Sequence, residues 1–158
     1  MYRVRRTEAG ASAVEFALVS TVLFLVLFGI IQYGMFFNDS LNARQGVREA
    51  VRQGIVKNFS GGTGATDMDK LADYTSKQVG AISGTTYVKI IPPSPWKKGS
   101  ALVVCAMVKS SGALGLLPMP DNGWITAKTQ MSIEQDTPVP TGGTVSPVVS
   151  GHSWAWCG

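Results

Sequence analysis

The sequence predicts an α+β fold. A long N-terminal transmembrane helix continues as a stalk and is followed by a helix packed on a small three-stranded antiparallel sheet and by an extended C-terminal tail. Residues 16–38 carry no charge, three short runs after residue 84 are rich in β-branched and apolar side chains, and residues 137–158 are rich in Pro, Gly, Thr and Ser. Charged residues make up only 15% of the 158 residues, below the ~25% usual for soluble domains. This composition favours a membrane segment or a weakly charged exported domain.

The uncharged run is long enough to cross a membrane as a helix. Its 23 residues at ~1.5 Å each make about 34 Å of helix, and a hydrocarbon core is ~30 Å thick. A cleaved secretory signal has a shorter apolar core and then a site of small residues, so we expect a retained span over residues 11–38. The charges do not fix its orientation, because Arg3, Arg5 and Arg6 precede it and Arg44, Arg48, Arg52 and Lys57 follow it.

The helical pattern continues beyond the span, and we expect a stalk helix within residues 39–60. Arg44, Arg48 and Arg52 recur every four residues, so they share one side of the helix and repel one another slightly. Anionic lipid or an acidic partner would hold such a ladder, whereas the simpler interpretation is a solvated face near the membrane; both stay open. The apolar side consists of Leu41, Ala43, Val47, Ala50, Val51 and Ile55.

The domain beyond the stalk is predicted over residues 61–136 as one helix and three strands. Thr66 is placed to cap the helix, and Asp67 and Asp69 in its first turn suit the helix dipole. Apolar side chains at helical spacing form the side that packs on a sheet, and they are Met68, Leu71, Ala72, Thr75, Val79 and Ile82. The strands are expected at residues 85–91, 101–109 and 124–134, the last of which alternates apolar and polar residues.

The two cysteines, Cys105 and Cys157, lie in the predicted middle strand and in the tail. A disulfide between them suits an exported domain. The alternative is that Cys105 is a small core residue and Cys157 a free thiol.

Several classes of function are not expected. Without residues 1–10 the chain holds 11 basic and 9 acidic side chains, and no basic patch interleaved with aromatic residues predicts nucleic-acid binding. His152 is the only histidine, and no metal-ligand cluster, phosphate-binding glycine loop or carboxylate pair accompanies it. We therefore expect no enzymatic activity, metal, cofactor or small-molecule substrate.

The start of the chain resembles the class III signals of type IV pilin-like proteins. A short basic segment ends at Gly10, and Ala11-Ser12-Ala13-Val14-Glu15-Phe16 opens the apolar run. The Glu-Phe pair, the continuation ALVSTVLFLVLFGIIQYGMFF and residues 42–54 resemble the TadE-like pseudopilins of tight-adherence (Tad/Flp) pilus systems. The order of helix, helix and three strands is also similar to TadE-like domains. Ser20 and Thr21 stand where such spans often carry a proline.

This resemblance implies a set of partners and a location. Residues 1–10 would be a cytoplasmic leader, cut between Gly10 and Ala11 by a prepilin peptidase, and the C-terminal domain would be extracytoplasmic. The other partners implied are Tad pilins or pseudopilins, an inner-membrane assembly platform and membrane lipid. The expected function is that of a pseudopilin or minor pilin. The alternative is an uncleaved single-span envelope protein that presents a small interaction domain.

The position of Glu15 calls for an explanation, because burying a carboxylate in a membrane helix costs free energy. Ala11 and Glu15 are four residues apart and share a helical face. Cleavage would create a charged α-amino group on Ala11, and in pilin-like assemblies the acidic residue is taken to pair with that terminus, its own or a neighbour's. The alternative is an interfacial carboxylate that stays hydrated.

Overall fold

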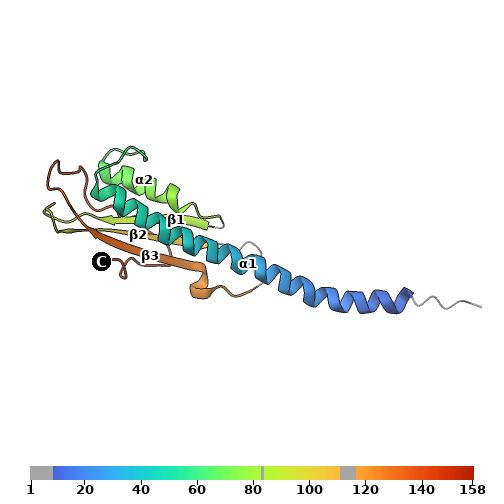
Figure 1. Ribbon diagram of the computed structural model, residues 1–158. Helices are drawn as coiled ribbons and strands as arrows, with labels where there is room; N and C mark the ends of the chain where they lie inside the picture. Colours follow the sequence, from blue (N-terminus) through green and yellow to red (C-terminus); the bar gives the residue numbers. More distant parts are fainter. Residues whose placement is uncertain (1–8, 83, 111–116) are drawn as a thin grey trace, which may run out of the picture.

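The computed structural model describes residues 9–82, 84–110 and 117–158 and confirms the predicted α+β class. The predicted leader, residues 1–10, lies outside the described residues except for its last two. A long helix projects from a small domain that lies at its C-terminal end (Figure 1). The elements in chain order are α1 (Ala9–Ile55), α2 (Asp67–Val79), β1 (Gly84–Ile91), β2 (Ala101–Ser110), the 3-10 turn η1 (Pro120–Gly123) and β3 (Trp124–Ser132).

The sheet is antiparallel, with the strand order β1-β2-β3. In the middle of the register Ala106 of β2 lies opposite Val88 of β1 and Ala127 of β3. All three strands agree with the predicted runs to within two residues. Helix α2 packs on β1 and β2, and α1 packs on β2 and β3. Both helices pack on the same face of the sheet, because the buried residues they contact alternate along each strand.

The second half of α1 is part of the core of the domain. Ala43, Val47, Ala50 and Val51 are fully buried between α2 and the sheet. The residues predicted as a stalk therefore pack against the sheet along their length as far as Ile55, where α1 ends. Leu41, which the sequence places on the apolar side, is instead 57% exposed.

Helix α2 begins and ends where local sequence signals indicate. Thr66 caps it in a capping box, in which its hydroxyl accepts from the Asp69 N–H and the Asp69 carboxylate accepts from the Thr66 N–H. Gly80 ends it in the left-handed conformation that favours glycine. Ile82 was expected on the apolar side, but it lies beyond this end and is 67% exposed.

The C-terminal tail is extended and packed against the domain. Ile90 of β1 and Val145 exchange two backbone hydrogen bonds of 2.9 and 3.0 Å, so the tail pairs with the outer edge of β1 at this one position. Further along, Cys157 is fully buried against the face of the sheet opposite the helices, where Cys105 and Met107 are also fully buried. The sheet is therefore covered on both faces, by helices on one and by the tail on the other.

Candidate functional site

The first half of α1 presents a large apolar surface that no part of the described chain covers. One helix of the described chain, Gly10–Ile55, is long and apolar enough to cross a membrane. Exposed apolar surface of this extent marks a site of contact with lipid or with other proteins. Its large side chains are between 43% and 71% exposed, and they are Val14, Phe16, Leu18, Val19, Val22, Leu23, Phe24, Leu25, Val26, Leu27, Ile30 and Ile31.

The domain meets this helix at Gly29. A Cβ added at Gly29 would lie 3.1 Å from Leu117 Cδ1, and one turn on the Gln32 side-chain N–H donates to the Leu117 carbonyl at 2.8 Å. The Tyr33 hydroxyl donates to the Pro118 carbonyl at 2.9 Å. Among the described residues, the part of α1 that precedes these contacts is residues 10–28, which we call the free part of α1, about 28 Å at ~1.5 Å per residue. Near its end, Leu117 lines a small hollow together with Thr21, Leu25 and Phe28. Residues 29–38, within the predicted span, pack on the domain through one face.

The predicted cleavage and charge positions all lie at the start of the free helix. Gly10, Ala11, Glu15 and Phe16 are exposed and helical, and the spacing of four residues sets Glu15 one turn after Ala11. Within the described chain no cation pairs with the Glu15 carboxylate.

Two hydroxyl residues, Ser20 and Thr21, lie within the apolar part of α1. The Ser20 and Thr21 hydroxyls both donate to the Ala17 carbonyl, at 3.1 and 2.9 Å. Because both hydroxyl groups donate to a carbonyl of the same helix, neither needs a hydrogen-bond acceptor from outside it.

The arginine ladder lies beside the last strand of the sheet. Arg44 and Arg48 are exposed on α1, and a cleft of about 290 Å³ between α1 and β3 is lined by both arginines together with Thr126 and Lys128. Arg52 is different, because its guanidinium lies 4.0 Å from the Glu49 carboxylate. Of the three predicted residues, Arg44 and Arg48 therefore flank the edge of β3, whereas Arg52 lies beside Glu49 further along α1.

The cysteines and the lone histidine fix the tail to the sheet. Cys105 and Cys157 are joined by a disulfide whose Cα atoms lie 6.1 Å apart. The His152 ring stacks on Trp124 with centroids 4.9 Å apart, and the Lys109 ammonium lies 4.9 Å from the centre of the Trp124 ring. In this arrangement His152 packs as an aromatic ring. Within the described ranges no group of three His, Cys, Asp or Glu residues is placed to hold a metal ion.

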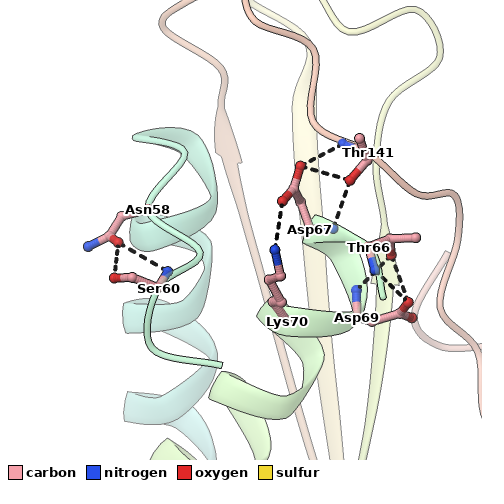
Figure 2. A network of polar contacts seen from close by, with 7 residues as sticks. All are labelled: Asn58, Ser60, Thr66, Asp67, Asp69, Lys70 and Thr141. Atoms are coloured by element: carbon pink, nitrogen blue, oxygen red, sulfur yellow. Dashed lines mark hydrogen bonds and ion pairs between the residues drawn. The ribbon is translucent and has the colours of Figure 1, made fainter. Parts of the chain in front are cut away.

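A polar network at the far end of the domain was not found from the sequence. Figure 2 shows the Asp67 carboxylate accepting from the Thr141 N–H and hydroxyl, at 2.8 and 2.9 Å, with the Lys70 ammonium 3.6 Å away. These contacts, led by the Thr141 backbone N–H, lower the pKa of Asp67. The network joins the tail to the start of α2 through residues that lie 74 positions apart in the sequence.

A second carboxylate holds the loop before α2. Asp73 accepts from the Lys77 ammonium at 2.6 Å and from the Thr63 N–H at 2.7 Å. The bond from Lys77, followed by those from Thr63, lowers the pKa of Asp73 to about 2.

One comparison with known proteins finds a family. A model of the family described as TadE-like protein matches residues 10–52. No curated protein and no solved structure matches the chain. The match confirms the resemblance predicted from the sequence over most of α1, and it includes Gly10, Glu15 and the arginine ladder.

Proposed function

We propose, from the TadE-like segment over residues 10–52, that this chain is a pseudopilin or minor pilin of a Tad/Flp-type pilus. It is cut after Gly10 by a prepilin peptidase and assembles through its N-terminal helix. One observation carries the proposal: the free part of α1 is mostly apolar and exposed, and its one carboxylate, Glu15, lies near its start. The family match and the long apolar helix both support a Tad pilus-associated component that is anchored in a membrane.

Before assembly, lipid covers the free helix. Residues 10–28 are about 28 Å long and match a hydrocarbon core of ~30 Å. In this arrangement the N-terminus is cytoplasmic and the domain that begins at Gly29 stands outside the membrane. In the assembled state the helices of neighbouring pilins or pseudopilins replace the lipid.

Glu15 gives the assembled helices a defined register. Hydrolysis of the Gly10–Ala11 peptide bond leaves a carboxylate on Gly10 and an α-ammonium group on Ala11. A carboxylate and an ammonium group that are both removed from water stabilise each other, and either one left alone there is costly. Pairing of Glu15 with the Ala11 terminus of a neighbour therefore favours one axial position of the two helices, whereas pairing within its own chain only allows the two charges to be buried together.

The alternative function uses the same helix as a permanent anchor. An uncleaved single-span protein would keep residues 1–10, and it would present its domain to a partner in the envelope. In that case Glu15 is a hydrated carboxylate at the membrane boundary, and its charge contributes nothing to association.

The substitution Glu15→Gln tests the proposed role of the charge. The amide is easier to bury than the carboxylate, so the variant should insert and be cut after Gly10. Loss of one partner of a buried ion pair typically costs ~3–5 kcal/mol, and exposure at the membrane boundary reduces that cost. We expect the variant to recover far less of its pilus partners when it is purified from detergent.

The matched control is Glu134→Gln, which neutralises an exposed carboxylate on the domain. It should recover the same partners as the unmodified protein. Equal recovery by the Glu15→Gln variant would show that Glu15 has no role in assembly.

A further inference from the structure

We propose that the outer edge of β3, together with Arg44 and Arg48, binds an acidic, extended segment of a partner protein, which adds to the sheet as a fourth strand. This surface does not include residues 10–28, the apolar part of α1 through which the proposed assembly takes place. The inference rests on an open strand edge, on two cations beside it that form no salt bridge within the described ranges, and on the distance of this surface from the membrane.

The two edge strands of the sheet, β1 and β3, differ in whether another segment pairs with them. The tail pairs with β1 at one position, where Ile90 and Val145 exchange two backbone hydrogen bonds. At β3, among the residues that the structure describes, no backbone bond joins positions 125–131 to any segment other than β2. A strand edge with free N–H and C=O groups is a template for an added strand.

The charges beside this edge are positive. Arg44 and Arg48 lie one turn apart on α1, and the salt bridges of the described chain include neither of them. Lys128 is exposed on β3, which carries no acidic residue. An acidic strand in the cleft between α1 and β3 would relieve the repulsion between the two arginines.

The ladder is too far from the membrane for lipid to be its ligand. Arg44 lies 15 residues beyond Gly29, or about 22 Å along the helix, and a tilt of 40° still leaves about 17 Å. The polar headgroup layer is only ~5–8 Å thick on each side. This step uses the proposed span over residues 10–28, whereas the open edge and the charges do not depend on it.

A second copy of the chain is also a poor partner. Two β3 edges brought together would place basic residues against basic residues, and lysine on an edge strand opposes such pairing. An acidic segment meets no such repulsion. The partner is therefore a different protein, with an extended segment that is rich in Asp or Glu.

The test measures binding of a synthetic peptide to the full, uncut chain in detergent micelles, so it does not depend on cleavage or assembly. The peptide has eight residues that alternate glutamate and valine and carries a fluorescent label, and its glutamine counterpart is the control. We expect fluorescence anisotropy to show binding of the acidic peptide only. Arg44→Gln with Arg48→Gln should raise its Kd about five- to tenfold, as expected for the loss of two partly exposed charge pairs.

Two further variants separate local charge from net charge and from folding. Lys97→Gln with Lys98→Gln removes the same two charges from an exposed loop and should change the Kd less than twofold. Arg44→Lys with Arg48→Lys keeps the charges and should keep most of the binding. If the two glutamine pairs weaken binding equally, or if the glutamine peptide binds as well as the acidic one, the proposed site is wrong.

Backbone methylation of the peptide tests the added strand itself. Only alternate N–H groups of an added strand face the sheet, so methylating one alternate set should abolish binding and methylating the other should leave it intact. Equal binding of the two methylated peptides would overturn strand addition. Crosslinking at Thr126 that yields a dimer of this chain in place of a peptide adduct would overturn the choice of partner.

Discussion

Removing the disulfide should release the end of the tail and destabilise the whole domain. The cross-link joins residues 52 apart in the sequence. On the chain-entropy account, closing a loop of that length restricts the unfolded chain enough to stabilise the fold by roughly 4 kcal/mol. Replacing Cys105 and Cys157 together by alanine removes this constraint without leaving a free thiol in the buried position. We therefore expect the free energy of unfolding of the double variant to be lower by roughly that amount.

The structure also predicts which part of the tail is released. Thr141 stays bound to Asp67, and Val145 stays paired with Ile90, because these contacts do not involve the cysteines. Beyond Pro147 the tail is held by the disulfide, by the stacking of His152 on Trp124 and by one hydrogen bond from Trp154 to the Pro147 carbonyl. Limited proteolysis of the double variant should therefore cut after residue 147 and leave the segment before it intact.

The assay is chemical denaturation of the full chain in detergent, followed by tryptophan fluorescence, with and without a reducing agent. The unmodified protein should lose stability on reduction, and the double variant should not respond. Alkylation of freshly isolated, unreduced protein should find no free thiol. Two alkylatable thiols, or a double variant as stable and as resistant to protease as the unmodified protein, would refute the reasoning.

Two other predictions concern the packing of the helices and the charges on α2. Gly46→Ala should lower the free energy of unfolding by about 1–2 kcal/mol, because its Cβ would meet the Val79 backbone nitrogen at 2.9 Å, and overpacking outweighs the gain in helix propensity. Gly34→Ala, with nothing within 4 Å of its Cβ, should cost nothing in the same denaturation assay, and equal losses would contradict the close approach of α1 and α2. The pKa of Asp73 is lowered to about 2, so its contribution to stability is complete above its ordinary pKa of 3.8 and is lost as the pH falls toward 2. The unfolding temperature should therefore fall more steeply over this range than in Asp73→Asn, and parallel curves would show that the ion pair with Lys77 does not stabilise the fold.

The elements could be predicted from the sequence because their signals are local. Thr66 and Asp69 form a capping box within four residues, and the alternation of Ile125, Ala127 and Met131 with polar residues gives the inward face of β3. The uncharged run likewise predicts a long helix. Each of these patterns depends only on neighbours in the chain.

The contacts between distant segments could not be predicted in this way. Gln32 reads as one polar residue in an apolar span, yet it is 1% exposed and its amide binds the backbone of Leu117. Asp39 reads as the first charge after the span, yet it is fully buried and accepts from the Ile82 N–H at 2.8 Å. Both residues place the start of the domain within α1, and their partners follow 85 and 43 residues later.

The residues of the candidate site also fall into those that the sequence alone relates and those that only the fold brings together. Gly10, Ala11 and Glu15 follow from spacing along one helix, so the sequence alone relates them. Arg44 and Arg48 flank the open edge of β3 because of the way α1 packs on the sheet. Spacing gives the side of the helix on which the arginines lie, but it does not identify the strand they meet.

The central claim, that this chain is a processed pilin-like subunit, is tested most directly by its N-terminus. Purified full chain in detergent is incubated with a prepilin peptidase, and intact mass with N-terminal sequencing identifies the product. We predict one new chain that begins at Ala11 and has lost residues 1–10, and we predict that Gly10→Leu blocks the cut. A chain that keeps residues 1–10, while the same enzyme preparation cuts a known prepilin, would contradict the account and favour an uncleaved membrane anchor.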